Sequence, residues 1–375
     1  MDDLNIKALR ALSHCPMSAD QLAEVLKISP GQSRELLHKL NPLLTVEASD
    51  AGTAFRLNAG MATVGVVDFS EARVLLLLSD LGGRVLARTS LPRAFIITES
   101  VLFETLNRLE ALLNEQAMAE LSALVLAVPG EIAPDSGRLI RSSRFADPEN
   151  LDLEALFSER FRCPVLLKND IRLAVEGELR YGNIQSAENA LMICFNASLG
   201  SAIMLGGQVY TGTHGLAGQL EHLLVNITDD NEPGSLAYCL SVPGMVKRAN
   251  KELEKYPDSL LHKLKDEDGV HTQDLCRGYL QNDPLCERIV HRAGKILANL
   301  IFNLGMFLDI NTVVLNGDIT GFGDKFLDYV RSVMPGSVLP IRVSYSGLKG
   351  RAAAVGGIQT AAEAAQAQLL KQAAR

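Results

Sequence analysis

The sequence has no tryptophan, no Cys-x-x-Cys pair and no uncharged apolar run long enough to cross a membrane. Its six cysteines are scattered, which argues against a disulfide framework or a zinc knuckle and indicates reduced thiols. The first residues are acidic and lack the basic and apolar regions of a signal peptide. We therefore expect a cytoplasmic protein that does not contact a membrane.

The charge and length narrow the class of protein further. The formal net charge is −8, which argues against broad, nonspecific coating of nucleic acid but leaves room for a small DNA-reading module. A chain of 375 residues with 47% apolar side chains is long enough for two or three globular units.

Residues 1–60 have the pattern of a winged helix-turn-helix. A first apolar stripe has helical spacing, and Ser18 and Ser29 are suitable N-caps for two further helices. Pro30 follows at the first helical position, where a missing N–H costs nothing. Residues 43–58 then read as two short strands around a turn. In this motif the second helix of the pair enters the major groove of DNA.

The helix after Ser29 is the expected DNA-reading element. We expect Leu36, Leu37 and Leu40 to face inward, and the side chains proposed to contact DNA are Gln32, Ser33, Arg34 and Lys39. The first three would lie near base edges and the lysine near a phosphate. Residues 1–60 carry six basic and seven acidic side chains, a net charge of −1, whereas DNA-reading modules are usually basic. A helical cap that contacts only protein is the alternative.

The rest of the chain predicts an α/β body. Residues 61–375 open with strands that pair back on each other, continue with alternating strands and helices, and then repeat this order. We expect a two-lobed, actin-like (ribonuclease H-like) ATPase-type fold. Lobe one would span about 61–180 with a closing helix at about 350–375, and lobe two about 181–349.

Five segments of the body resemble the ROK family, which groups sugar kinases with sugar-responsive transcriptional repressors. They follow the family's order and spacing and are residues 128–143, 164–182, 212–225, 316–324 and 351–362. The resemblance covers essentially the whole chain. A winged helix in front of such a body is the arrangement of the repressor branch.

The loops that would cradle ATP depart from the family pattern. Kinases of the family have a Gly-Gly-Thr-Lys-like turn after the first strand, where backbone N–H groups approach the phosphates. Here residues 68–73 contain no glycine, and Asp68 and Glu71 are expected to repel a triphosphate. The second loop is Asn196, Ala197 and Ser198 instead of Gly-Thr-Gly, and the third has Asn316 before Gly317 where the family has another glycine.

The family's sugar and zinc residues are also only partly present. The family pattern Gly-Glu-x-Gly-His, in which the glutamate binds sugar hydroxyls, becomes Gln219, Glu221 and His222. The three zinc cysteines that follow in many members are absent; the last aligns with Ser235, and a further sugar-binding glutamate aligns with Ala237. A tetrahedral zinc needs four ligands, so we expect no metal site here. His222 is then either a partly buried, hydrogen-bonded residue or a ligand contact.

Asp170 aligns with the family's general base, which would activate a sugar hydroxyl that attacks the γ-phosphate. Without the phosphate loops that base has no phosphoryl donor, so we treat it as vestigial. The resemblance implies a non-catalytic ligand site formed by Asn169, Asp170, Gln219, Glu221 and His222. A bulkier or more anionic sugar, acylated or phosphorylated, would suit the loss of two carboxylates.

We therefore expect a transcriptional regulator of carbohydrate-related genes, most simply a repressor, with no cofactor. Its partners would be operator DNA, a sugar or sugar-phosphate effector and further copies of itself in a dimer or tetramer. Two rivals remain open: an atypical sugar kinase, and an interaction protein that has lost both DNA and sugar binding.

Overall fold

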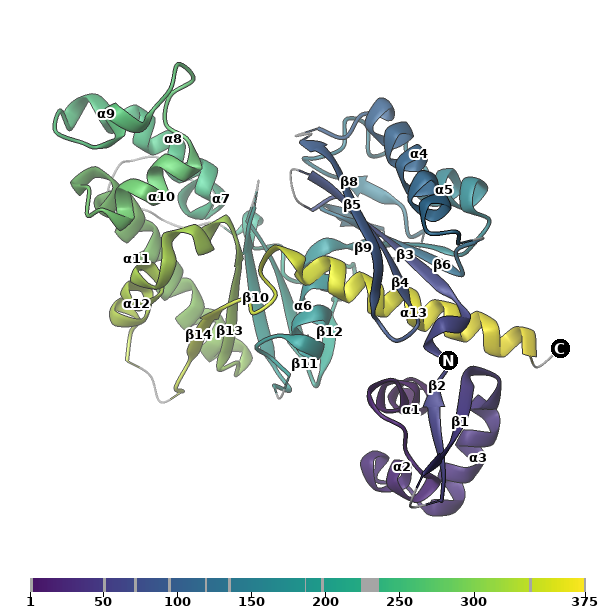
Figure 1. The fold of residues 1–375 in the computed structure, drawn as a ribbon. Helices are drawn as coiled ribbons and strands as arrows, with labels where there is room; N and C mark the ends of the chain where they lie inside the picture. Colours follow the sequence, from purple (N-terminus) through teal and green to yellow (C-terminus); the bar gives the residue numbers. More distant parts are fainter. Residues whose placement is uncertain are drawn as a thin grey trace. The chain divides into compact units, whose positions relative to one another are not determined.

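The computed structural model describes most of the chain in two compact units (Figure 1). The described residues are 3–49, 52–70, 73–93, 96–118, 120–133, 136–185, 187–196, 199–223, 236–336 and 339–373. The first unit contains Met1–Asp170 together with Ala354–Arg375, and the second contains Ile171–Ala353. The chain thus crosses from the first unit to the second between Asp170 and Ile171, earlier than the expected boundary near residue 180, and it crosses back between Ala353 and Ala354.

Three helices and a two-stranded sheet open the first unit (purple in Figure 1). Their bounds are α1 (Asp3–His14), α2 (Ala19–Leu26), α3 (Pro30–Leu40), the 3-10 turn η1 (Asn41–Leu43), β1 (Leu44–Ser49) and β2 (Gly52–Leu57). Ser18 and Ser29 each form a capping box with the glutamine three residues on, Gln21 and Gln32. Lys27, at φ 54°, ends α2 in the left-handed region. These local signals give the helix-turn-helix and the wing that the sequence predicts.

A five-stranded sheet forms the body of the first unit, in the order β5-β4-β3-β6-β9. Its strands are β3 (Thr63–Asp68), β4 (Arg73–Asp80), β5 (Val85–Arg93), β6 (Ala123–Val128) and β9 (Val165–Asn169). The smaller elements are η2 (Ala59–Met61) and the pair β7 (Glu131–Ile132) and β8 (Leu139–Arg141), and the helices are α4 (Glu99–Glu115), α5 (Leu153–Phe161) and α13 (Ala352–Ala373). The first three strands are antiparallel, whereas β6 and β9 run parallel to β3.

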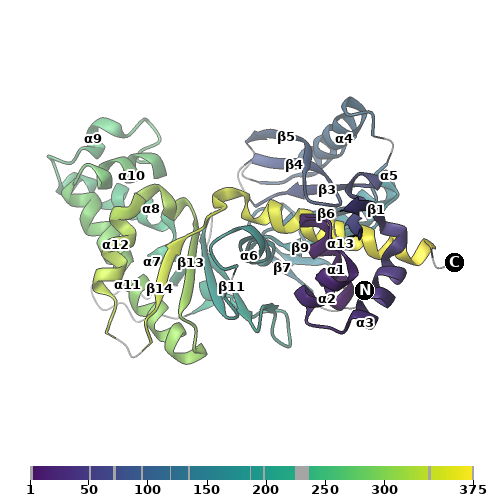
Figure 2. The same cartoon turned by 60° about the horizontal axis from the view of Figure 1, so that its bottom comes forward.

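The two faces of this sheet bury different helices because side chains alternate along each strand. Val67 belongs to the core formed with α4 and α5. Its neighbour Val66, with Leu77 of β4, packs on Ile358 of α13. A Cβ at Gly357 would lie 2.9 Å from Val66 Cγ1, so only glycine allows this close approach. Figures 1 and 2 show α13 (yellow) running across the sheet, and the expected packing of the closing helix on the first lobe is confirmed.

α13 also contacts the winged helix. Arg10 of α1 donates through Nε and Nη2 to Oε1 of Glu363, at 3.1 and 2.5 Å. The Gln359 side chain, one turn earlier on α13, donates to the same oxygen. Because the two charged side chains are 45% and 23% exposed, solvent weakens this ion pair, and it positions α1 more than it stabilises the fold.

The second unit is built around a sheet of the same design, in the order β12-β11-β10-β13-β14. Its strands are β10 (Ala190–Phe195), β11 (Leu199–Leu205), β12 (Gln208–Tyr210), β13 (Thr312–Gly317) and β14 (Arg342–Tyr345). Three antiparallel strands are again followed by two that run parallel to the first. The internal repeat expected from the sequence is therefore present in the topology.

Helices surround this second sheet. They are α6 (Asp170–Tyr181), α7 (Leu236–Leu240), α8 (Val242–Glu252), α9 (Leu261–Leu264), α10 (Thr272–Leu280), α11 (Pro284–Leu308) and α12 (Gly323–Val333), with the 3-10 turns η3 (Leu220–His222), η4 (Leu253–Lys255), η5 (Asp318–Phe322) and η6 (Lys349–Arg351). Apolar residues of α8, α10, α11 and α12 share one core with β10 and β13. Within the described ranges, no helix has both the length and the apolar composition to cross a bilayer.

A buried carboxyl group holds together the two segments by which the chain enters and leaves the second unit. Glu178 of α6 is fully buried. Its Oε1 accepts from Ser346 Oγ at 2.6 Å and from Leu348 N at 2.8 Å. Its Oε2 accepts from Asn183 N at 2.7 Å and Gly347 N at 3.3 Å. α6 begins at the first crossing and residues 346–348 lead into α13, so Glu178 ties the two connections to each other.

We predict that Glu178→Gln lowers the free energy of unfolding of the second unit by about 2–4 kcal/mol, because an amide has one acceptor oxygen and leaves two of the four donors facing its NH2 group. Urea unfolding measures this cost. Glu104→Gln, at an exposed position of α4, is the matched control and is expected to change little. Equal unfolding midpoints for the two variants would contradict the role of Glu178.

Candidate functional site

The helix expected to read DNA has one buried and one exposed face. Ser33, Leu36, Leu37 and Leu40 are buried. Gln32, Arg34 and Lys39 are exposed on α3, as predicted, and so are Glu35 and His38, which the sequence analysis did not include. The buried set has the spacing i, i+3, i+4 and i+7 of a single helical stripe.

The assignment of Ser33 to the DNA-facing surface is wrong. The residue is fully buried, and its hydroxyl donates to the backbone carbonyl of Ala19 at 2.6 Å, at the start of α2. It therefore joins the two helices of the motif. Its spacing from Leu36, Leu37 and Leu40 was the signal that could have placed it on the inner face.

The exposed side chains of Gln32 and Arg34 have local partners. Gln32 Oε1 accepts from both the N–H and the hydroxyl of Ser29, at 3.0 Å each. Arg34 Nη2 lies 3.7 Å from Asp20 Oδ1, with both side chains at least 70% exposed. The glutamine amide thus keeps only its NH2 group for an external partner, whereas the arginine contact is weak and is easily exchanged for another anion.

Asn169 and Asp170 lie at the carboxyl end of β9, where sites in open α/β sheets are usually found. Asn169 Nδ2 donates at 3.0 Å to the carbonyl of Gly130, which follows the neighbouring strand β6. Gly130 has φ +142°, and a Cβ there would lie 2.2 Å from Arg141 O. Asp170 is only 4% exposed and begins α6. The pair is therefore anchored in the first unit, at a strand end built by glycine.

The loop that carries Gln219 belongs to the second unit and is shaped by three glycines with positive φ, Gly212, Gly215 and Gly218. Arg172 Nη2 donates to Gly215 O at 2.5 Å, and Ser201 Oγ donates to Gly218 O at 2.7 Å. Burial lowers the pKa of the Arg172 guanidinium. The loop is thus held by a strand and a partly buried cation before it reaches Gln219.

Gln219, Glu221 and His222 lie together around the short turn η3. Gln219 is partly buried, and the side chains of Glu221 and His222 are 31% and 56% exposed. His222 Nε2 lies 3.7 Å from Glu221 Oε1. A histidine this exposed does not fit a partly buried structural role. Ser235 lies outside the described residues, as does the side chain of Ala237.

The aspartate of the first phosphate turn is buried in the protein. Asp68 is 1% exposed, and its Oδ1 accepts from Ser70 N at 2.9 Å. Burial raises the pKa of this carboxyl. The Asp68 carboxyl, which was expected to repel a triphosphate, therefore lies inside the protein. The next residue, Phe69, is also buried and packs edge-on against Phe145, with ring centroids 5.3 Å apart. Glu71 lies outside the described residues.

The second and third phosphate loops lie against each other at the carboxyl ends of β10 and β13. Gly317 has φ +88°, and a Cβ there would lie 2.2 Å from Asn196 Oδ1 and 2.6 Å from Phe195 O. The Asn316 side chain is 7% exposed, with Nδ2 3.8 Å from Cys194 Sγ. Side chains therefore occupy space that glycines leave open in the family pattern. Ala197 and Ser198 lie outside the described residues.

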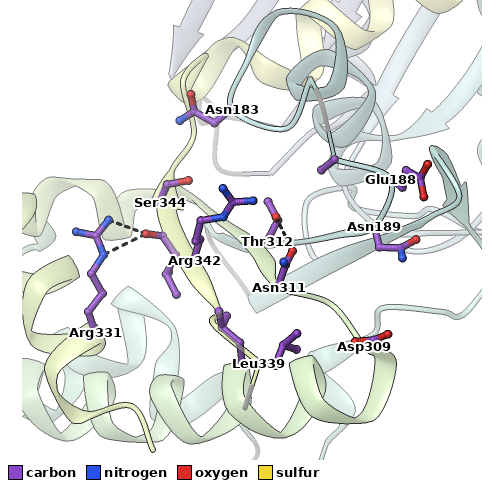
Figure 3. A pocket seen from close by; sticks show the side chains of 13 residues that line it. Asn183, Glu188, Asn189, Asp309, Asn311, Thr312, Arg331, Leu339, Arg342 and Ser344 are labelled. Carbon is purple, nitrogen blue, oxygen red and sulfur yellow. Dashed lines mark hydrogen bonds between the residues drawn. The ribbon is translucent and has the colours of Figure 1, made fainter. Parts of the chain in front are cut away.

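A cavity of about 990 Å³ lies at the opposite, amino ends of β10, β13 and β14 (Figure 3). Arg331 donates through Nε and Nη2 to Val343 O at 3.2 and 2.7 Å, and Asn183 Nδ2 donates to Tyr345 O at 2.7 Å. Both carbonyls belong to β14, the edge strand of the sheet. These side chains thus cover an open sheet edge, and the cavity contains none of the predicted ligand residues.

The model of the ROK family matches residues 64–349. This match covers most of the chain. The chain belongs to the ROK family. The residues before 64, which include the winged helix, lie outside the family model.

Proteins similar in sequence to this chain include both regulators and kinases. The DNA-binding transcriptional dual regulator NagC of Escherichia coli is 23% identical over 327 residues, covering 83% of this chain and 79% of NagC. A glucokinase of Halalkalibacterium halodurans is 25% identical over 234 residues, covering 60% of this chain and 70% of the glucokinase.

Solved structures share the fold to different extents. A ROK family transcriptional regulator, described as a homolog of the E. coli MLC protein, has a TM-score of 0.83 at 18% identity and covers 98% of this chain and 97% of its own. A ROK glucokinase from Streptomyces griseus, solved with glucose and AMPPNP, has a TM-score of 0.68 at 19% identity and covers 80% of this chain and 99% of its own. The predicted winged helix and actin-like fold are thus confirmed, and the kinase leaves a fifth of this chain unmatched.

We predict that Gly218→Ala distorts the loop before Gln219, because φ is +89° and the new Cβ would lie 2.5 Å from Ser201 O. Gly207→Ala is the matched control: its φ is +73°, but nothing lies within 4 Å of the new Cβ. The control should lose about 1–2 kcal/mol of stability for the backbone conformation alone, and Gly218→Ala should lose more. Thermal unfolding and proteolysis within residues 211–222 measure the difference, and equal losses would show that the Ser201 contact does not constrain the loop.

Proposed function

We propose that this chain is a DNA-binding transcriptional regulator of carbohydrate-related genes, with a non-catalytic sugar-kinase-like body that senses a ligand. The main support is a complete winged helix in front of a ROK body, because a ROK regulator covers 98% of the chain at a TM-score of 0.83. Several relatives are repressors by name, among them the N-acetylglucosamine repressor of E. coli. Repression is therefore the simplest direction of regulation.

The winged helix would bind operator DNA through the exposed face of α3. Gln32 and Arg34 would approach base edges, and Lys39 would neutralise a phosphate. Oligomers of this chain, dimers or tetramers, would place two such helices on the two halves of a palindromic site. Residues 1–60 have a net charge of −1, so contacts with phosphates would supply less of the affinity for DNA than in a basic module. Contacts with bases would then supply a larger share.

The body would sense a sugar or sugar phosphate through two sets of residues. Asn169 and Asp170 belong to the strand end in the first unit, and Gln219, Glu221 and His222 belong to the glycine-shaped loop in the second. The partly buried Arg172, which holds that loop, adds a positive charge and supports an anionic effector. Asp170 would accept a hydroxyl hydrogen bond rather than a proton to be transferred.

α13 is the element best suited to couple the ligand to DNA. The chain returns from the second unit to the first within the first turn of α13, and Glu363, further along, contacts Arg10 of the winged helix. A ligand that favours one arrangement of the lobes would move this helix and shift the affinity for the operator.

The alternative of a sugar kinase is favoured by Asp170, which occupies the position of the family's base. The phosphate turn argues against it. Kinase catalysis depends on backbone N–H groups that approach the phosphates closely, and the turn has a buried aspartate and a buried phenylalanine instead of glycines. The third possibility, an interaction protein that has lost both DNA and sugar binding, is favoured by the charge of −1 in residues 1–60 and by the loss of the two sugar-binding glutamates at Gln219 and Ala237.

If the chain is a transcriptional regulator, it should bind one specific operator sequence. In a selection of genomic fragments by the purified chain, we expect one palindromic site to be enriched at about 50 mM salt and to survive about 200 mM salt. Arg34→Ala should cost about 1–3 kcal/mol on that site and relax its sequence preference. Lys39→Ala should weaken binding to all sequences. It should also reduce the slope of log K against log salt concentration by about one, because one phosphate contact is lost. No enrichment at either salt concentration would overturn the proposal.

The same proposal predicts no sugar phosphorylation. With MgATP and a panel of hexoses, hexosamines and their acylated forms, a coupled ADP-release assay should give the same rate as sugar-free controls. Asp170→Asn is the control variant, because the base contributes typically 10²- to 10⁴-fold to such a reaction. Turnover by the wild-type chain that Asp170→Asn abolishes would make the protein a kinase.

A further inference from the structure

The outward face of α3 contains one carboxylate, that of Glu35, among side chains that donate hydrogen bonds. Its exposed side chains are Gln32, Arg34, Glu35, His38 and Lys39. Residues three and four apart lie on the same side of a helix, so Glu35 and His38 are neighbours, and so are Arg34 and His38. Glu35 therefore lies in the middle of the surface that would face a groove, and Gly31, four residues before it, has no side chain to cover it.

The exposed face of α3 offers many more hydrogen-bond donors than acceptors. Arg34 and Lys39 can only donate. A free glutamine could both donate to and accept from adenine, but Gln32 Oε1 already accepts twice from Ser29 and offers outward only NH2 donors. No hydrogen bond or ion pair to Glu35 is found among the described residues. The strong acceptor on this face is therefore the Glu35 carboxylate.

We propose that Glu35 determines sequence specificity by accepting a hydrogen bond from the N4 amino group of a cytosine in the major groove. This inference depends on the proposed function, because it presumes that α3 reads DNA. A carboxylate is repelled by phosphates and by the acceptor edges of guanine and thymine, so it penalises every register without a donor at that position. Glu35 would thus lower affinity for DNA in general and raise the contrast between sequences.

The test is a selection from randomised duplexes by the full-length wild-type chain and by Glu35→Ala and Glu35→Gln. Glu24→Gln is the matched control, since Glu24 is an exposed glutamate of α2 and the change removes the same charge from the same module. Binding to the selected site and to its single-base variants is then measured by fluorescence anisotropy. Thermal unfolding checks that all four chains are folded.

We expect the wild-type chain to prefer one C·G pair in each half-site by on the order of 10-fold. Glu35→Ala should lose this preference, and Glu35→Gln should shift it toward adenine, which an amide can pair with bidentately. Glu24→Gln should keep the wild-type preference. All three variants should bind arbitrary DNA somewhat more tightly, because each removes one negative charge.

The outcomes separate this inference from the proposed function. A wild-type chain that selects a site, with the same preference in both Glu35 variants, would overturn the role of Glu35 and leave the regulator intact. A preference lost at a pair other than C·G would also overturn it. A wild-type chain that selects no sequence would overturn both proposals.

Discussion

The buried carboxyl group of Glu178 is the constraint on which the arrangement of the second unit depends. Four donors from Ser346, Leu348, Asn183 and Gly347 converge on its two oxygens. A carboxyl group in an apolar interior is stable only when it is hydrogen-bonded in this way. Because α6 and residues 346–348 join the second unit to the first at its two crossings, one side chain fixes both connections to the same sheet.

α13 extends from this connection to the winged helix. Close to the second crossing it packs on β3 and β4 through Ala354 and Ile358, and Gly357 lets it approach the sheet closely. Two turns later Glu363 contacts α1 of the winged helix. A continuous helix is stiff over this distance, whereas the ion pair of Glu363 with Arg10 is partly exposed and weak. The winged helix thus contacts α13 through an ion pair that a small change in the body can alter.

The turn between β3 and β4 departs from the family's glycine-rich pattern without a change in the fold. Asp68 and Phe69 are buried: Asp68 Oδ1 accepts from Ser70 N, and Phe69 packs against Phe145, so the turn contributes to the core of the first unit. In the second unit Asn196 lies against Gly317, and Asn316 lies beside Cys194. Both changes fill space with side chains, which adds contacts where a nucleotide-binding loop would leave a gap.

Much of this protein was determined by sequence alone, because its local patterns are strong. Capping serines, the apolar stripes of the helices and the strand periodicity predicted the winged helix and the repeated α/β body, and five segments of the body together identified the family. Tertiary structure decided which side chains face outward. Ser33 was assigned to DNA and is buried against Ala19, and Asp68, which was expected to repel a triphosphate, lies inside the protein. Residue type predicts polarity, but only the packing of one element on another determines whether a polar group contacts solvent or satisfies a neighbour's backbone.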